Sequence, residues 1–394
     1  MTAVEVGQYV EAPPETGRFA RRWRALPPWA KALLVMLACE LVTALVLDRA
    51  AHFTVLTSAG DTGPVSYPGF VARWDSAWYR RIAQLGYPAV VPHLPDGRVA
   101  QNPWAFYPLY PAAAAVLMRL GIAWPYAPLL ISFGSSMASA VLLRSVVARL
   151  AGPAVALWSV ALLGSFPAAP VLQLAYSEAL ALALLLAVLR CLQRGQYWWA
   201  VAATLALGLT RPIAVPLGVV VLVHVVRRWR RGPRPALAVL AVAAVAAAVL
   251  WPAVVAVRTG DLHTYTDTMA AWRPGAVHLL QPWWSRSGQY LGPVFGRVLV
   301  LALPVTVLWW LTRPLARRLG ADLRVWTTAY LGYLYLVLDP TTSLFRYLLL
   351  FFPIGVLLLL ASPSVAYRRT LVAASFGLQL VWVVVIWRTA FGPP

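Results

Sequence analysis

The sequence is poor in charge, and above all in acidic residues. Only 12% of its 394 residues are charged, and Asp and Glu together number 13. A water-soluble chain carries about twice that charged fraction. Apolar runs near the roughly 20 residues that a helix needs to cross a bilayer recur along the whole chain. We therefore expect an all-α polytopic membrane protein, and the continuous rather than alternating runs exclude a membrane β-barrel.

Cysteine and lysine are scarce as well. The two cysteines, Cys39 and Cys191, lie far apart in predicted helices, which excludes a disulfide framework and a thiolate metal site. Lys31 is the only lysine. This preference for arginine is typical of a GC-rich bacterial genome, so we expect a multi-pass protein of the bacterial plasma membrane, or of the endoplasmic reticulum if the chain is eukaryotic.

Several nucleotide-binding motifs are missing. The sequence has no G-x-x-x-x-G-K-[ST] phosphate loop, no Rossmann glycine pattern and no D-x-D motif, which argues against a nucleotide-sugar donor. The net charge of +20 does not indicate nucleic acid, because the arginines stand at the ends of apolar runs, where they orient helices in a bilayer. Such arginines also attract anionic lipid. The predicted partner is the lipid bilayer, and no nucleic acid.

The apolar runs predict about eleven transmembrane helices. Residues 1–28 are expected to form a cytoplasmic tail and residues 29–394 a single transmembrane domain, whose first span is too long to be a cleaved signal peptide. This arrangement puts the C-terminus outside and 20 of the 33 Lys and Arg residues at short cytoplasmic ends. The expected spans are 29–50, 126–148, 153–170, 172–192, 197–211, 213–227, 235–257, 293–312, 323–338, 344–361 and 368–388.

Most of the remaining sequence falls into two external loops, at about 51–125 and 258–292. The assignment depends on residues 105–121, which would reverse the later loops if they crossed the membrane. We interpret them as a helix that lies along the membrane interface and has prolines at its N-terminal end. Two long loops on one face are where we expect the chemistry.

Loop one contains "RWDSAWYRRIAQLGY", residues 73–87. Four apolar residues share one helical stripe: Trp74, Trp78, Ile82 and Leu85. Asp75 lies between the two tryptophans. It is either a structural acid that pairs with a nearby arginine (Arg73, Arg80 or Arg81) or a partly desolvated acid whose raised pKa makes it a proton acceptor. The other acids in or beside the loop lack this aromatic setting and are expected to be solvated: Asp48, Asp61 and Asp96.

Loop two is rich in Trp, Tyr and His. Its aromatic residues form either an interfacial belt or a platform on which sugar rings stack. Asp261, His263 and Asp267 resemble a metal site only weakly, because the pattern lacks further support. We expect no metal.

Four charged residues within or at the ends of predicted spans carry further hypotheses. Arg211 and Arg346 stand at outer helix ends, where guanidinium groups suit a lipid-linked phosphate. Glu178 lies near the outer end of its helix, beside Tyr176. Glu40 lies near the middle of the first span, where a carboxylate is costly, and is either functional or a hydrogen-bonded structural residue.

Five sequence blocks together resemble the PIG-V family, the second mannosyltransferase of GPI-anchor assembly and its bacterial relatives. "RWDSAWYRRIAQLGY" and "AFYPLYP" carry most of the resemblance, and "YSEALALALLL", "LALGLTRPIAVPL" and "FRYLLLFFP" follow in the family's order. The resemblance covers about residues 70–361. The sequence departs from the family between Tyr87 and Ala105, where Asp96 is the only acid and eukaryotic members often have a glutamate just before the second block.

The resemblance implies a GT-C glycosyltransferase fold, a polyprenyl-phosphate-mannose donor, inversion at the anomeric carbon, and no metal or other cofactor. It implies a glycolipid, glycan or protein acceptor. Asp75 would be the catalytic base, and the donor phosphate would be bound by Arg346, Arg211 and Tyr347. The remaining matched residues would contact substrate: Trp74, Trp78, Tyr79, Tyr107, Tyr176 and Glu178.

The main alternative is a membrane transporter or a flippase for lipid-linked sugars. Glu40 and the proline-interrupted spans favour it. Against it, the sequence shows no paired halves, and its polar residues gather at the outer face rather than at the midplane. A non-enzymatic scaffold would leave the Trp-Asp block unexplained.

Overall fold

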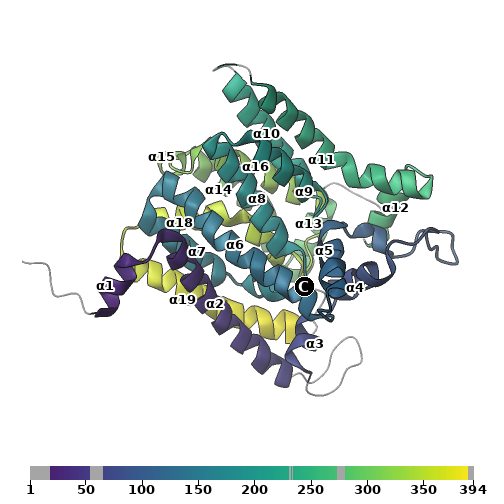
Figure 1. Cartoon of the computed structure of the whole chain (residues 1–394), viewed down its shortest axis with the longest axis horizontal. Helices are drawn as coiled ribbons and strands as arrows, with labels where there is room; N and C mark the ends of the chain where they lie inside the picture. Colours follow the sequence, from purple (N-terminus) through teal and green to yellow (C-terminus); the bar gives the residue numbers. More distant parts are fainter. Residues whose placement is uncertain (1–17, 54–64, 230–231, 233, 273–279, 389–394) are drawn as a thin grey trace, which may run out of the picture.

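The computed structural model describes residues 18–53, 65–229, 232, 234–272 and 280–388, and within them the regular structure is helical apart from one β-bridge. Figure 1 shows long helices crossing the molecule diagonally, with shorter ones at its two ends. In this part of the chain six segments have the length and apolarity that crossing a membrane requires: α2 (Pro28–His52), α6 (Tyr126–Ala151), α11 (Pro235–Thr259), α14 (Phe295–Thr312), Leu344–Ala361 and Val365–Trp387. The predicted all-α, multi-pass membrane class is confirmed.

The other five expected spans are helical but shorter or more polar. Four of them have 17 residues or fewer, and the fifth, α16, has 18 but carries Asp322 and Arg324 near its start. The count of eleven transmembrane helices is therefore not shown. The five are α7 (Pro153–Gly164), α8 (Glu178–Arg194), α9 (Tyr197–Gly208), α10 (Ala214–Trp229) and α16 (Gly320–Val337).

The expected spans 153–170 and 172–192 are wrong at their junction. α7 ends at Gly164, and the chain then makes only the short 3-10 turn η2 (Ala169–Gln173) before α8 begins at Glu178. Pro167 and Pro170 explain the break, because proline has no N–H to donate to a helix. The bend brings Ser177 and Glu178 to the start of α8, below loop one.

Loop one contributes α3 (Tyr67–Val71), α4 (Asp75–Leu85), η1 (Pro103–Ala105) and α5 (Leu109–Arg119). With 11 residues, α5 is only about 16 Å long and cannot by itself cross a hydrocarbon core of about 30 Å. This length fits the interfacial helix expected within residues 105–121.

The apolar stripe expected on α4 is wrong. Its buried residues are Ser76, Tyr79 and Ile82, whereas Leu85 is 78% exposed. Trp74 has a positive φ and lies outside the helix, so it does not share a helical face with Trp78.

Loop two contributes α12 (Thr264–Ala270) and α13 (Gln281–Leu291), and it packs against loop one. The Asn102 side-chain amide donates to the Thr268 hydroxyl at 3.0 Å, and the Trp272 ring lies 5.3 Å from the Trp78 ring. Figure 1 shows α4, α5 and α12 at one end of the molecule, with α1 (Arg18–Ala25) and α15 (Pro314–Arg317) at the other. The two loops thus pack together at one end of the bundle.

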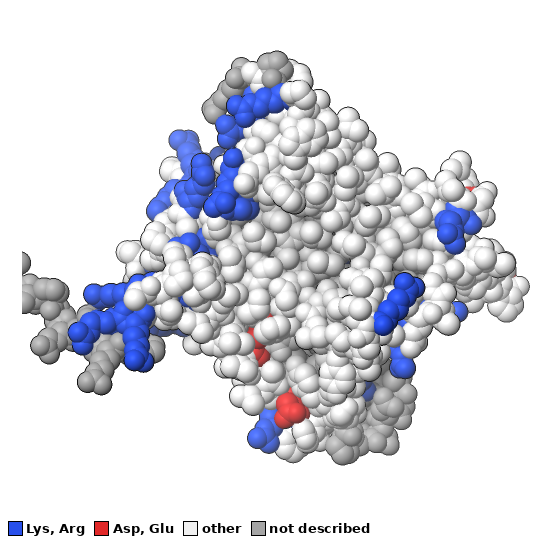
Figure 2. All heavy atoms as spheres, viewed as in Figure 1, with Lys and Arg blue, Asp and Glu red and all other residues white. Residues whose placement is uncertain are grey.

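Charge is distributed as a membrane requires. Figure 2 shows Lys and Arg gathered over α1 and near the end of α10, with a broad uncharged surface between them and the loop end. The core lies largely around α6 and α8, where Leu143, Leu182, Leu185 and Leu189 are almost fully buried. Helices α7 and α2 approach each other closely at Gly164, where an added Cβ would lie 2.6 Å from the Cβ of Cys39.

The predicted orientation can be tested with single cysteines in a chain whose two native cysteines are replaced by alanine. Ala154→Cys and Gln196→Cys lie at exposed ends predicted to be cytoplasmic, and Val90→Cys lies in loop one at 81% exposure. In intact cells an impermeant maleimide should label only Val90→Cys, and permeabilisation should add the other two. Labelling of Ala154→Cys from outside would reverse the arrangement.

Candidate functional site

Four charged side chains from distant segments meet beneath loop one. Asp75 starts α4, Glu178 starts α8, Arg211 lies between α9 and α10, and Arg346 lies in α17 (Leu344–Tyr347). We call these four residues the charged cluster. Glu178, Arg346 and Arg211 are 2%, 7% and 8% exposed. The Asp75 side chain keeps 20% exposure, so it is the member most open to a ligand.

The charges of the cluster balance. Nη1 of Arg346 lies 2.6 Å from Oδ2 of Asp75, and Nη1 of Arg211 lies 2.7 Å from Oε1 of Glu178. Nε of Arg346 lies 3.5 Å from the same Glu178 oxygen and joins the two pairs. A buried charge without a partner destabilises a protein by several kcal/mol, about 3–5 when one member of a buried pair is removed. Two cations and two anions together avoid that cost.

Local sequence places each member. The two carboxylates stand in the first turns of α4 and α8, where the positive end of the helix dipole favours an anion. Arg211 precedes Pro212, and the residue before a proline is disfavoured in a helix, so α9 has already ended. Glu178 is almost fully buried and forms ion pairs with both arginines. It would therefore act on a substrate through the arginines rather than by direct contact.

Tyrosines surround the two guanidinium groups. Cζ of Arg346 lies 5.3 Å from the ring centroids of both Tyr176 and Tyr347, and Cζ of Arg211 lies 5.2 Å from that of Tyr347. The backbone N–H of Asp75 donates to the Tyr176 hydroxyl at 3.4 Å. These contacts fix the planes of the guanidinium groups.

Ser177 connects Tyr79 to the cluster. Its hydroxyl lies 2.8 Å from the Tyr79 hydroxyl and accepts a hydrogen bond from Arg211 at 3.2 Å. Burial raises the pKa of Tyr79, so that phenol stays neutral at physiological pH and serves as a hydrogen-bonding group rather than a base. Sequence reasoning did not select Ser177, because no local pattern marks a serine whose partners lie 34 and 98 positions away.

The arginines keep hydrogen-bonding capacity for an anion. Nε of Arg211 is buried and has no hydrogen-bond partner among the residues that the structure describes. Oε1 of Glu178 lies at ion-pair distance from both arginines without the alignment of a hydrogen bond. Guanidinium N–H groups in this arrangement can bind phosphate oxygens in a fork.

Two predicted substrate residues lie in a neighbouring aromatic group rather than in the charged cluster. The Trp78 ring stacks on Phe106 at 5.8 Å, and the Tyr107 hydroxyl lies 2.9 Å from that of Tyr265. Burial, followed by Tyr265, raises the pKa of Tyr107. The Tyr79 ring, 5.2 Å from Phe106, joins this group to the cluster. Tyr265 and Trp272 of loop two therefore pack against loop one beside the charged cluster.

The remaining acids have other surroundings. Asp261 accepts from the His263 N–H at 2.9 Å and so forms a local turn before α12. In the described ranges no three His, Cys, Asp or Glu residues are arranged to hold a metal ion. Asp96 pairs with exposed Arg98 at 2.7 Å, and Asp61 lies outside the described residues. Glu40 is 6% exposed in α2.

Trp74 has an unusual backbone conformation directly before Asp75. Its φ of 56° and ψ of −119° are those of the first central residue in a type II′ turn, a position that favours glycine. The Ser76 N–H donates to the Arg73 carbonyl at 3.2 Å and closes this turn. A side chain in such a conformation costs about 1–3 kcal/mol and is found mostly at functional sites. The turn sets the direction in which Asp75 leaves the backbone.

Replacing Trp74 with glycine or alanine tests this strain. Both variants lose the indole ring, so they differ only in backbone preference. Glycine tolerates the positive φ, and we expect Trp74→Gly to be more stable than Trp74→Ala by about 1 kcal/mol. The same exchange at Ala77, inside α4, should favour alanine. Thermal melting of the purified variants measures both differences, and a more stable Trp74→Ala would show that the turn is unstrained.

Comparison with known proteins supports the fold but identifies no family. No protein-family model matches the chain, and no curated protein matches it. The structure is similar to the crystal structure of ArnT from Cupriavidus metallidurans bound to undecaprenyl phosphate, with a TM-score of 0.50 and 17% sequence identity over 89% of this chain. The match covers 63% of ArnT, so the chain spans less than two thirds of that protein's length. The chain is thus all-helical and structurally like the GT-C fold of ArnT, while the resemblance to the PIG-V family stays a prediction.

Proposed function

We propose that this chain is an inverting membrane glycosyltransferase that transfers mannose from a polyprenyl-phosphate donor to a glycolipid, glycan or protein acceptor at the outer face of a bacterial plasma membrane. The charged cluster is the observation that carries the proposal, because it holds a partly open carboxylate 2.6 Å from a guanidinium group. The bound lipid in the ArnT crystal structure supports the lipid-phosphate donor. Mannose rests on the sequence blocks alone.

The two arginines would hold the donor phosphate. Cζ of Arg346 and Cζ of Arg211 lie 5.3 and 5.2 Å from the Tyr347 ring centroid, so both guanidinium groups are near one ring. The cluster has no net charge, so an arriving phosphodiester would use Nε of Arg211, which has no hydrogen-bond partner in the described part of the chain, and also share a guanidinium group that a carboxylate now occupies. Arg346 is the member that can be shared, because its partner Asp75 is the more exposed carboxylate.

Asp75 would act as the base. As an acceptor hydroxyl oxygen forms a bond to C1 of the sugar, its proton moves to the Asp75 carboxylate. The bond between C1 and the phosphate oxygen breaks, and its electron pair leaves with polyprenyl phosphate. Attack from the face opposite the phosphate inverts C1. The leaving phosphate is a weak base, so a general acid is not needed.

The ion pair couples these two events. When Asp75 accepts a proton it becomes neutral, and the cluster gains one positive charge. In the same step the donor phosphate changes from a diester with one negative charge to a monoester with up to two. Arg346, released from Asp75, can then stabilise the charge that develops on the leaving group.

Transfer of labelled mannose from polyprenyl-phosphate mannose to a membrane lipid extract tests the function. We expect a labelled product with polyprenyl-phosphate mannose and none with a nucleotide sugar. A flippase, which buried Glu40 favours, would move the labelled donor across vesicles without making a product. A product formed from the nucleotide sugar alone would overturn the proposal.

Asp75→Asn tests the base. Asparagine keeps the size of aspartate but cannot accept a proton, so turnover should fall by about 10²- to 10⁴-fold. Stability should fall too, because Glu178 would then be the only anion paired with Arg346. Rates are therefore compared per folded molecule, from active-site titration and melting of the same sample. Asp96→Asn, in the exposed pair with Arg98, is the matched control and should keep full turnover. Near-normal turnover of folded Asp75→Asn would exclude Asp75 as the base.

Arg346→Lys tests the phosphate contact. Lysine keeps the charge but loses the planar fork of the guanidinium group. Arg346→Lys should therefore weaken use of the lipid donor more than Arg98→Lys, the exposed control, does. We expect kcat/KM for the donor to fall about tenfold or more. A tenfold fall corresponds to a loss of about 1.4 kcal/mol of transition-state stabilisation. An unchanged kcat and KM would remove Arg346 from the donor site.

A further inference from the structure

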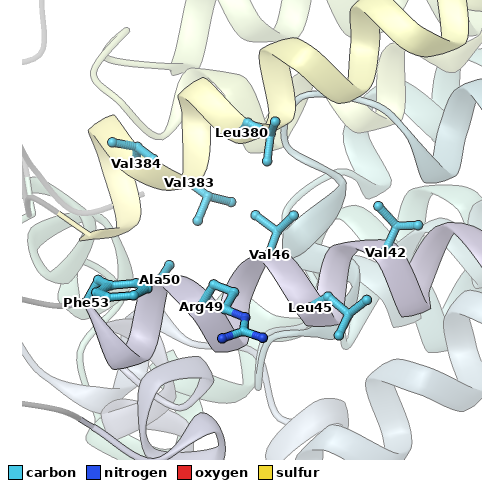
Figure 3. Close-up of a pocket in the computed structure, with 9 residues that line it drawn as sticks. All are labelled: Val42, Leu45, Val46, Arg49, Ala50, Phe53, Leu380, Val383 and Val384. Atoms are coloured by element: carbon cyan, nitrogen blue, oxygen red, sulfur yellow. The ribbon is translucent and has the colours of Figure 1, made fainter.

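An apolar groove runs between α2 and the C-terminal helix α19 (Val365–Trp382) with its continuation η4 (Val383–Arg388). Its volume is about 410 Å³. Figure 3 shows Val42, Val46 and Ala50 along one side and Leu380 and Val383 along the other. Both helices belong to segments able to cross a membrane, so the groove faces the bilayer rather than water.

One charged residue lines the groove. Arg49 stands one turn before the end of α2, and Figure 3 shows its side chain among the lining residues. It is exposed and makes no ion pair or side-chain hydrogen bond within the described part of the chain. The neighbouring acid, Asp48, lies 3.7 Å from His52 instead. The groove is therefore apolar along its length, with one basic side chain near one end.

The length of the groove matches one leaflet. Along α2 it runs from Val42 to Phe53, a rise of about 16 Å. That is about half of a hydrocarbon core of roughly 30 Å. A guanidinium group near the helix end reaches the headgroup level, while its stem covers apolar surface.

We infer that this groove binds one anionic phospholipid, with an acyl chain along α2 and α19 and its phosphate on Arg49. The match to a single leaflet favours a phospholipid over a polyprenyl chain, which is longer than a leaflet. This inference does not depend on the transferase activity.

The lipid would also support the candidate site. The groove is walled by Val383 and Val384, and Trp387 follows one turn later. The Trp387 ring lies 6.1 Å from Phe70 and 6.0 Å from Tyr176, whose hydroxyl accepts from the Asp75 N–H. A lipid that fills the groove holds η4 against α2 and so stabilises this side of the cluster.

Native mass spectrometry of the detergent-purified protein tests the site with phosphatidylglycerol and phosphatidylcholine of identical acyl chains. The wild type should bind one phosphatidylglycerol about fivefold more tightly than phosphatidylcholine, the effect of one arginine at an anionic surface. Arg49→Gln should remove that preference, whereas Arg119→Gln, an exposed arginine of α5, should keep it. Phosphatidylglycerol should raise the melting temperature of the wild type but not of Arg49→Gln.

A second pair of variants tests the apolar part. Val46→Trp fills the groove and should weaken both lipids, while Leu34→Trp, an exposed residue in the other half of α2, should weaken neither. The inference would be overturned if Arg49→Gln preferred phosphatidylglycerol over phosphatidylcholine as strongly as the wild type does. Displacement of phosphatidylglycerol by an equal concentration of polyprenyl phosphate would also overturn it, because the groove would then belong to the carrier lipid.

Discussion

The ion pair between Asp75 and Arg346 joins residues 271 positions apart, and the polar end of the molecule is organised around it. Burying one charge alone would cost more than the fold can easily support, so each carboxylate is matched by an arginine. Glu178 and Arg211 complete a set of four with no net charge. The same neutrality makes the site responsive, because a proton added to Asp75 or a phosphate bound to Arg346 changes the balance that holds the cluster together.

The surroundings of the pair hold its geometry. Trp74 adopts a conformation better suited to glycine, and Tyr176 accepts the N–H of Asp75, so the carboxylate is directed from both its backbone and its neighbour. Packing of loop one on loop two, through Asn102 and Thr268, closes this end of the bundle. The proposed role of Asp75 as a base near an acceptor hydroxyl and a phosphate would require such a rigid support.

The distribution of charged and uncharged surface fits a protein that lies in a bilayer. Many of the arginines gather at one end of the molecule, next to a broad uncharged surface, while the loops lie at the other end, where Figure 2 also shows basic side chains. Arg49 stands in an apolar groove at the loop end. A phospholipid there would couple the surrounding membrane to α2, η4 and, through Trp387, to the wall of the site.

The sequence by itself determined the helical class and the apolar spans, and it predicted two loops on one face and Asp75 and Arg346 as site residues. These depend on hydropathy, helix-breaking prolines and short motifs, which are local. Only the tertiary structure decided which charges meet. Asp75 lies against Arg346, whereas Arg80 and Arg81 of its own helix fall outside the i+3 and i+4 positions and are exposed. The strained turn at Trp74 and the groove beside Arg49 likewise appear only in the tertiary structure, whereas the break between α7 and α8 follows from the local prolines Pro167 and Pro170.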